Sequence, residues 1–387
     1  MTSKPTDSPE SARIMQEFEV RYSYPVVFTR AVFDPHNLSV VELIENRDPP
    51  PAILPAVDSN VLLKNPALAT QIEQYFSAHH LKVLPTLVID GGETCKRDDR
   101  AVQNVYQAVI DHKIDRHSYI VVVGGGAVID AVGYAAATAH RGIRLIRVPT
   151  TVLAQNDAAV GVKNAINLQG RKNFLGTFVP PHAVISDFEL LETLEDRDKR
   201  AGIAEAIKVA LIKDKTFFNE LFSQRQQLAS FERQAMENMI IKGAKWHLNH
   251  IAGHGDPFES GSARPLDFGH WSAHKLEELT NNELRHGEAV AIGIAIDAIY
   301  SHRIGRLGAD ELDKIITLLC KVGFKLRHPA LGSLDIEQAL HEFKEHLGGK
   351  LCITVLDEIG SGVEVNEIDV DTMRDAIDSL LKLANAA

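Results

Sequence analysis

Short apolar runs alternate with amphipathic stretches through the first half of the chain. Each run is rich in valine, leucine and isoleucine and is closed by glycine, proline or a polar turn, which is typical of buried strands. Because parallel strands need a helical crossover between them, this alternation predicts a parallel α/β sheet. The predicted strands are AILPAVDSNV (52–61, ending in a turn), TLVID (86–90), YIVVVGGG (119–126), RLIRVPTT (144–151) and AVISD (183–187).

The pattern changes in the second half of the chain. Between residues 195 and 320, apolar residues recur at helical spacing, as in AGIAEAIKVALI and GEAVAIGIAIDAIYSHRI,. We therefore predict a flexible extension over 1–20, an α/β domain over 21–187 and a mostly helical domain over 188–387. The tail should hold one strand, KLCITVL, and a final helix, DTMRDAIDSLLKLA.

Composition narrows the possible functions. The 387 residues carry a formal net charge of −11, which argues against nucleic-acid or anionic-membrane partners but leaves room for a local basic pocket,. The three cysteines form neither a metal-ligand pair nor a disulfide framework, which favours a reducing compartment,. The amino terminus lacks a signal-peptide core, and the longest apolar stretch, 119–139, is interrupted by glycines and Asp130,. These features predict a cytoplasmic protein with a small-molecule ligand.

Three consecutive glycines, Gly124–Gly126, separate a predicted strand from a predicted helix. Glycines at such a turn let backbone N–H groups approach a phosphate at the helix N-terminus, although a simple tight turn would look the same. The pattern differs from G-x-G-x-x-G, so an ordinary Rossmann dehydrogenase is not the first choice. Asp58, Asn60, Glu93 and Lys96 should lie at the same carboxyl edge of the sheet, where ligands bind,.

Three segments of the second half carry residues that suit a metal ion. Glu205 and Lys208 are three apart on one helix, His270 and His274 are four apart on another, and His286 stands where a further helix begins,. A carboxylate with two histidines can hold a divalent ion and leave positions open for water or substrate. A purely structural role is the commoner fate of a histidine on a mixed helical face.

A second histidine cluster competes with this set. His247, His250 and His254 follow one another at spacings of three and four in WHLNHIAGH and could share a helix face,. Gly253 and Gly255 suggest that the helix ends there. We expect this cluster to be a solvated or partly buried face rather than the functional metal site.

A basic, glycine-punctuated segment follows the VPTT strand. Lys163, Arg171, Lys172 and Asn173 lie within GVKNAINLQGRKNFLGTF. In an acidic protein, such a concentration of cations is either an anion-binding pocket or an exposed basic loop.

Taken together, these segments resemble the dehydroquinate synthase superfamily over most of the chain, from about Asp58 to Lys350. The resemblance depends on the order and spacing of many motifs rather than on any one of them. They are DSNV, GGE-x-x-K at 91–96, GGGAVID, HRG at 140–142, VPTT, DAAVGVK at 157–163, RKNFLGTF, AEAIK, DFGHWSAH and RHGEAVAIG.

The resemblance implies a two-domain fold, an α/β nucleotide-binding domain followed by a helical metal-binding domain, with the site in the cleft between them. It implies zinc or cobalt as the metal and the metal ligands Glu205, His270 and His286. The positions that match NAD-binding residues are Asp58, Asn60, Glu93, Lys96, Gly124, Gly125, Gly126, Asp130, Thr150, Thr151 and Lys172.

The resemblance also implies a substrate pocket and a catalytic set. Arg141 matches an arginine that reaches the phosphate in a neighbouring subunit, which implies a homodimer. The catalytic positions are Lys208, His274, Asp157 and Lys163, and the substrate positions are Arg141, Lys163, Lys172, Asn173, Asp267 and Lys350. In this family NAD transiently oxidises a ring hydroxyl, phosphate is eliminated, the hydride returns and an intramolecular aldol addition closes a carbocycle.

The choice of substrate depends on the approach to the metal motif. Dehydroquinate synthases carry an asparagine and, four residues earlier, an arginine that hold their substrate carboxylate, whereas this chain has Asp267 and Ala263 there, with Arg264 one position off. RPLDFGHWSAHKLE instead resembles 2-epi-5-epi-valiolone synthases, which cyclise sedoheptulose 7-phosphate. We expect that substrate, although Arg264, Lys242 or Lys245 could still receive a carboxylate.

Other functions stay open at this point. LAQNDAAVGVKNAIN keeps a dehydroquinate-synthase character, so the dehydroquinate reaction or another sugar phosphate is possible. A metal-dependent polyol dehydrogenase would release NADH and would not need the phosphate pocket of Lys163, Lys172 and Asn173. A non-catalytic binding protein should have lost a ligand or Lys208, and none is missing.

Overall fold

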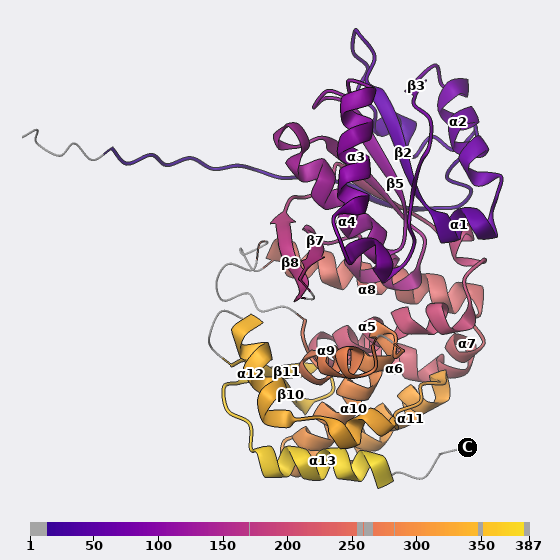
Figure 1. Ribbon diagram of the computed structural model, residues 1–387. Coiled ribbons are helices and arrows are strands. Elements are labelled where there is room, and N and C mark those ends of the chain that lie inside the picture. The colour runs from indigo at the N-terminus through magenta and orange to yellow at the C-terminus, as the bar shows by residue number, and fades with distance from the viewer. Residues whose placement is uncertain are drawn as a thin grey trace, which may run out of the picture.

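A computed structural model describes residues 14–169, 171–253, 258, 266–281, 283–346 and 351–382. The chain forms an α/β half and a helical half, one above the other in Figure 1. Residues 14–20, in the predicted extension, are exposed and lie outside helices and strands. Among the described residues, no helix is both long and apolar enough to cross a membrane.

The first half is built on a parallel seven-stranded sheet with the order β1-β9-β6-β5-β2-β3, in which β4 also pairs with β2. The α/β class predicted for this half is confirmed. The strands are β1 (Val26–Thr29), β2 (Ala52–Asp58), β3 (Lys82–Val83), β4 (Leu87–Ile89), β5 (Tyr119–Gly124), β6 (Arg144–Pro149) and β9 (Ala183–Asp187).

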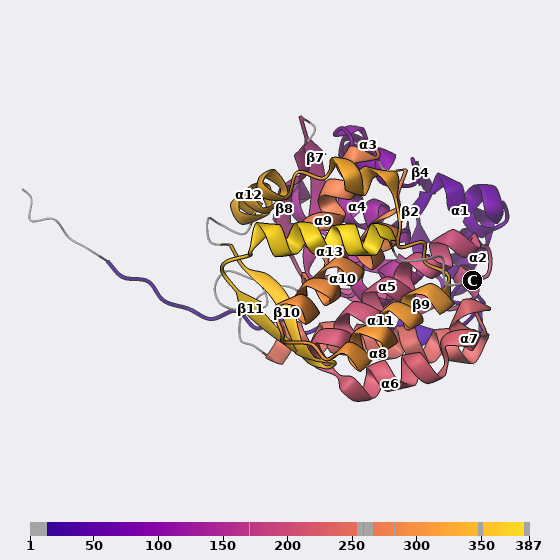
Figure 2. The same cartoon turned by 90° about the horizontal axis from the view of Figure 1, so that it is seen from below.

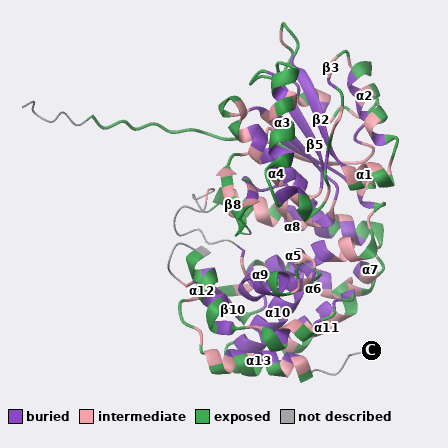
Figure 3. Cartoon of the chain, viewed as in Figure 1, coloured by how far each residue is buried: buried purple, intermediate pink, exposed green. Residues whose placement is uncertain are grey.

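Helices cover both faces of this sheet, so its central strands are buried throughout (Figure 3),. One face packs against α3 (Arg100–Asp111) and α4 (Gly126–Thr138). The other face packs against α2 (Leu68–Ala78) and residues 32–44. A short helix, α1 (Ser59–Lys64), begins directly after β2 because the Asp58 carboxylate accepts a hydrogen bond from the Asn60 N–H,.

An antiparallel hairpin, β7 (Lys163–Leu168) and β8 (Arg171–Phe178), stands beside α4. It contains the basic segment that the sequence predicts only as a loop. A π-helical turn, η4 (Ala154–Ala158), leads from the sheet into this hairpin.

The second half is helical, as predicted, and α10 is its centre. This helix is apolar on nearly all sides and is buried along most of its length, with α13 lying across it in Figure 2,. The helices are α5 (Asp196–Lys213), α6 (Lys215–Ser223), α7 (Arg225–Ala229), α8 (Arg233–Gly253), α9 (His270–Leu279), α10 (His286–Arg303), α11 (Ala309–Val322), α12 (Ile336–His346) and α13 (Val370–Lys382).

The carboxyl-terminal tail contains two strands where the sequence predicts one. β10 (Ile353–Glu358) and β11 (Ser361–Val365) form an antiparallel hairpin. Gly360 makes the turn with φ of 92°, a conformation that glycine adopts without strain,.

A buried arginine joins the sheet to the segment that enters the cleft. Arg147, on β6, is fully buried and donates hydrogen bonds to the carbonyls of Ala159 (2.9 Å) and Gly161 (2.7 Å) and to Oδ1 of Asn164 (2.7 Å). Burial lowers the pKa of Arg147 to about 10, so the guanidinium keeps its charge at neutral pH. It therefore fixes η4 and the start of β7 on the sheet.

We predict that Arg147→Met lowers the free energy of unfolding by about 3 kcal/mol or more, because several buried acceptors lose their donor at once. Urea unfolding followed by circular dichroism would measure this change. The matched control is Arg144→Met on the same strand, since Arg144 is partly exposed and pairs with the exposed Glu45. We expect a loss of at most about 1 kcal/mol there. Equal losses in the two variants would contradict this role for Arg147.

Candidate active site between the two halves

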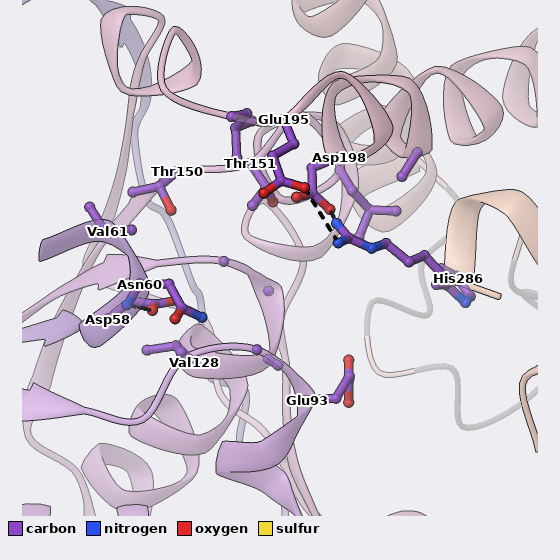
Figure 4. A pocket seen from close by; sticks show the side chains of 18 of the residues that line it. Asp58, Asn60, Val61, Glu93, Val128, Thr150, Thr151, Glu195, Asp198 and His286 are labelled. Atoms are coloured by element: carbon purple, nitrogen blue, oxygen red, sulfur yellow. Dashed lines mark hydrogen bonds and ion pairs between the residues drawn. The ribbon is translucent and has the colours of Figure 1, made fainter. Parts of the chain in front are cut away.

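A cleft of about 650 Å³ separates the carboxyl edge of the sheet from the helical half. The side chains of Asp58 and Asn60 stand on the sheet side of this cleft, and His286 stands on the helical side (Figure 4). Arg285 forms ion pairs with Asp198 and Glu195 along one wall. The cleft thus brings together residues that the sequence places on different predicted strands and helices.

The sheet side of the cleft has a close-packed backbone. β5 ends at Gly124, and Gly125 and Gly126 start α4. A Cβ at Gly124 would lie 2.9 Å from a methyl group of Val128, so a side chain there would force the turn apart. Gly125, Gly126 and Thr151 line the cleft, so the N-terminus of α4, where backbone N–H groups favour an anion, stands at its wall,.

Lys96 is buried at 3% exposure next to this turn. Its ammonium lies 2.8 Å from Oδ2 of Asp130 and also donates to Oδ1 of Asn173 on β8. Burial raises the pKa of Asp130, and the Lys96 ammonium opposes that shift. Two predicted cofactor residues are therefore paired with each other, and Glu93 lines the cleft beside them.

The predicted metal ligands come together on the helical side. Glu205 on α5 is 2% exposed, and its Oε1 lies 3.5 Å from Nε2 of His286 and 3.8 Å from Nε2 of His270. Ligand atoms about 2.1 Å from a tetrahedral ion are about 3.4 Å apart, so this spacing suits one divalent ion. Oε2 of Glu205 is in ion-pair contact with Lys208, whereas Oε1 accepts no hydrogen bond of good geometry among the described residues, so Oε1 is the oxygen available to a cation.

Electrostatics support a cation at this point. Burial raises the pKa of Glu205, but the Lys208 ammonium, in ion-pair contact, and His286 outweigh it and lower the pKa to about 2. Burial and the Lys208 charge hold the pKa of His270 well below its usual value, so its imidazole stays neutral and keeps a lone pair. Burial lowers the pKa of His286, yet Glu277 and Glu205 raise it to about 9, so at neutral pH a metal ion binds at Nε2 only by displacing a proton,.

Glu277 is a site residue that sequence reasoning missed. This buried carboxylate on α9 accepts from Nδ1 of His286 (3.1 Å) and, through its other oxygen, from the ammonium of Lys172 (3.0 Å) on β8. It thereby orients His286 and joins the hairpin of the first half to the helical half. His270, His274 and Glu277 recur at helical spacing in DFGHWSAHKLE, which is the signal that could have found it,.

A second group of potential metal ligands overlaps the first. His274, Glu277 and His286 also bring one donor atom each within 4.8 Å of one another. Because Nδ1 of His286 faces Glu277 and Nε2 faces Glu205, the two groups share one imidazole. The Glu205 group is the better candidate for the ion, because Nε2 of His270 and Nε2 of His286 both face the same oxygen of Glu205, whereas the two oxygens of Glu277 are used by Lys172 and by Nδ1 of His286.

The competing histidine cluster does not assemble as a metal group among the described residues, and His254 lies outside them. One member nevertheless reaches the site. Nδ1 of His247 on α8 lies 2.7 Å from Oδ1 of Asp157 on η4. Burial raises the pKa of Asp157, but His247 outweighs it and the pKa is lowered. Sequence reasoning did not connect His247 with Asp157.

The other predicted residues lie at different distances from the cleft. Asp267 stands just before the turn into α9 and is close enough to Lys208 to affect its pKa: burial lowers the pKa of that lysine, and Glu205, Asp157 and Asp267 raise it above its usual value. Lys163 begins β7 and is exposed. Lys242 forms an ion pair with Glu220. Lys350, Ala263 and Arg264 lie outside the described residues.

The fold and the site define a class: a two-domain protein with a nucleotide-type glycine turn facing a carboxylate and two histidines. The comparisons agree. A family model described as 3-dehydroquinate synthase N-terminal matches residues 86–201, and one described as 3-dehydroquinate synthase C-terminal matches residues 202–346. The chain belongs to the dehydroquinate synthase superfamily, a family of sugar phosphate cyclases, which confirms the predicted membership.

Relatives with two different names share this fold and sequence. A 3-dehydroquinate synthase of Nitrosospira multiformis is 36% identical over 285 residues, covering 73% of this chain and 77% of the relative. A 2-epi-5-epi-valiolone synthase of Streptomyces glaucescens is 31% identical over 364 residues, covering 93% and 92%. The solved structure of ValA, a 2-epi-5-epi-valiolone synthase from Streptomyces hygroscopicus subsp. jinggangensis 5008 with NAD+ and Zn2+ bound, is 27% identical, with a TM-score of 0.85 and coverage of 95% and 99%.

Glu277 provides a test of the metal centre. We predict that Glu277→Gln weakens zinc binding by about 10- to 100-fold, because the amide cannot serve both His286 and Lys172 and no longer carries the charge that makes the imidazole basic. Competition with a chromogenic chelator would measure the affinity. The neighbouring Glu278→Gln is the matched control, since Glu278 is exposed and pairs with Lys275. An unchanged zinc affinity in Glu277→Gln would remove Glu277 from the centre.

Proposed function

We propose that this chain binds NAD and one divalent ion, zinc or cobalt, and converts sedoheptulose 7-phosphate to a cyclitol of the 2-epi-5-epi-valiolone type. Phosphate is eliminated, and NAD is regenerated in each cycle. The observation that carries the proposal is Asp267 beside Lys208, where the dehydroquinate synthases carry an amide for their substrate carboxylate. A valiolone synthase relative and the ValA structure match nearly the whole chain, and a relative named 3-dehydroquinate synthase does so too, so the choice between the two substrates rests on Asp267.

The cofactors belong in the two walls of the cleft. The glycine turn with Asp58, Asn60 and Thr151 would hold NAD, and Glu205, His270 and His286 would hold the ion. When bound, NAD takes up and returns a hydride, and the ion polarises the reacting hydroxyl as a Lewis acid.

The chain's own residues position the substrate between these walls. Lys208 is held by Glu205 and stays charged, because Glu205 and Asp157 raise its pKa against burial, so it orients substrate oxygens. Asp157 stays ionised beside His247 and can accept hydrogen bonds from hydroxyl groups,. We assign the substrate phosphate to Lys172 and Asn173 on β8 and to Lys163,. His274 lies next to His286, on the side of the cleft that carries the proposed metal ligands.

We also propose a homodimer. Arg141 is exposed in the turn before β6, so it stands at the amino edge of the sheet, away from the cleft of its own chain. An arginine that binds phosphate from that position must serve the cleft of a second copy.

The dehydroquinate reaction is the second candidate, because several relatives carry that name. It requires a buried partner for a substrate carboxylate, and an unpaired buried charge is strongly unfavourable. Asp267 would add a like charge. A polyol dehydrogenase is less well supported, because it has no use for a phosphate pocket.

The first test concerns the metal ligands. His270→Ala should remove both the bound divalent ion and phosphate-releasing activity, because one of three protein ligands is lost. Elemental analysis of the purified protein measures the ion. His250→Ala on α8 is the control and should keep both. Full metal occupancy in His270→Ala, with loss only in His250→Ala, would move the site to the other histidine cluster.

The second test concerns the substrate. We predict that purified enzyme with NAD and zinc releases phosphate from sedoheptulose 7-phosphate faster than from the carboxylate-bearing substrate of dehydroquinate synthase. Discrimination that depends on unpaired polar groups reaches about 10⁴-fold, so the comparison is decisive. NADH absorbance should stay flat during turnover, since the hydride is returned.

Asp267→Asn refines this test. If Asp267 accepts hydrogen bonds from substrate hydroxyls, the amide should lower kcat/KM for the ketose phosphate while leaving the bound metal in place. Faster turnover of the carboxylate substrate by the unaltered enzyme would establish the dehydroquinate reaction instead, and steady accumulation of NADH would indicate a dehydrogenase.

A further inference from the structure

The two histidines of the proposed metal centre have different partners behind them. Nδ1 of His286 faces the Glu277 carboxylate directly, whereas Nδ1 of His270 lies 3.2 Å from the carbonyl oxygen of Phe268. A carbonyl oxygen can only accept a hydrogen bond, so Nδ1 of His270 must carry the hydrogen. That tautomer leaves the lone pair on Nε2, the nitrogen that faces Glu205.

The peptide unit that holds His270 is itself held by a buried carboxylate. The N–H of Gly269 belongs to the same peptide unit as the Phe268 carbonyl, and it donates to Oδ2 of Asp297 at 2.9 Å. Asp297 lies on α10 and is 1% exposed. Its other oxygen, Oδ1, accepts from Nε1 of Trp271 at 2.8 Å. Both oxygens are therefore used, one on each side of His270 in sequence.

The local backbone is built to allow this contact. Gly269 has φ of 80°, and a Cβ there would lie 2.6 Å from the backbone nitrogen of Ile294 on α10. Only glycine lets the turn press against α10 so closely. Burial raises the pKa of Asp297 to about 7, which the Trp271 and Gly269 donors oppose. Burying a carboxyl group at this position costs free energy of folding, so we expect Asp297 to have a functional role.

We propose that Asp297 is a positioning residue for the metal centre, which acts on His270 through the Phe268–Gly269 peptide unit. The chain of contacts runs from the carboxylate to the peptide N–H, from the peptide carbonyl to Nδ1–H, and across the ring to Nε2. Hydrogen bonds in series polarise one another, and a ligand histidine backed by negative charge is a better donor to a metal. The proposal rests on the metal site assigned above.

The arrangement gives both histidine ligands the same kind of support. His286 is backed by Glu277 directly, and His270 is backed by Asp297 through one peptide. His286 and Asp297 lie on α10 eleven residues apart, about three helical turns, so one buried helix carries a ligand and the support for the other ligand,.

The rival explanation is that Asp297 only clamps α9 to α10. Two variants separate the explanations. Asp297→Asn has the same shape, but it loses the charge and can accept only one of the two N–H groups. Trp271→Phe disturbs the same carboxylate and removes one buried hydrogen bond, yet it leaves the Gly269 contact to Asp297 intact. Both should lower the melting temperature, because each leaves a buried polar group unpaired.

Zinc affinity, measured by chelator competition on the full-length protein at a pH well above 7, where Asp297 is ionised with or without the Trp271 donor, is the deciding readout. We expect Asp297→Asn to bind zinc at least about 10-fold more weakly, and Trp271→Phe to bind it as tightly as the unaltered protein. The absorption spectrum of the cobalt-loaded protein should shift only in Asp297→Asn, because only this substitution changes how strongly His270 donates to the ion.

Two results would overturn the proposal. One is equal weakening of zinc binding in both variants, which would indicate a clamp alone. The other is unchanged zinc affinity in Asp297→Asn while His270→Ala has lost the ion, which would leave the metal site standing without this support. If His270→Ala keeps its zinc, the metal assignment fails first and the role of Asp297 fails with it. Should Asp297→Asn not fold, a Trp271→Phe protein with weakened zinc binding would still contradict the proposal.

Discussion

A buried carboxylate in the helical half is the constraint on which the site depends. Glu205 is almost completely enclosed, and removing an ionised carboxyl group from water costs several kcal/mol unless cations surround it,. Lys208, one helical turn away, supplies one cation, and His270 and His286 stand where the proposed divalent ion would supply another. In the core α5 packs against α8 and α10, and the start of α9 brings His270 to Glu205, so these helices meet at one point.

The same need links the two halves of the chain. Glu277 orients His286 from the helical half and binds Lys172 from the β7–β8 hairpin of the first half. Arg147 holds the segment that leads into that hairpin, and His247 on α8 meets Asp157 on η4. Polar contacts made at the cleft therefore tie the sheet to the metal wall. A substitution on one side of the cleft should therefore alter the other side, because side chains from the two sides contact each other directly.

Much of the fold could be predicted from hydrophobic spacing, and the misses have local causes. The strand predicted over 52–61 ends at Asp58, because the Asp58 side chain caps a helix that apolar spacing does not reveal. The sequence predicts a loop where the β7–β8 hairpin lies, because β8 is mostly exposed and only Asn164 and Ile166 of β7 are buried. Strand β11 is likewise short and polar, so only its pairing with β10 defines it.

The site could be predicted for the residues that lie in recognisable motifs. It could not be predicted for the residues that support them through hydrogen bonds. The three residues predicted as metal ligands come together, because they lie on three strongly patterned segments, and their role as ligands stays a prediction. Glu277 and Asp297 escaped notice, since a carboxylate on a helix is usually a solvated one and only the packing shows what it faces,. The sequence does not distinguish His247 from His250 and His254, because spacing alone cannot tell which member of a cluster points toward the cleft.

The charges in the cleft explain how an acidic protein can bind an anionic sugar phosphate. Lys96, Lys172 and Lys208 are each held by a carboxylate from another part of the chain or from the preceding helical turn: Asp130, Glu277 and Glu205. Such pairing keeps the long side chains in place before a ligand arrives, so less conformational entropy is lost on binding. The cleft does not need an excess of basic residues, because its cations are fixed where we propose that the phosphate and the reacting oxygens lie. A net charge of −11 for the whole chain and a phosphate-binding pocket are therefore compatible, since the field at the site is set by the few oriented groups inside it and the surface charges are screened by salt,.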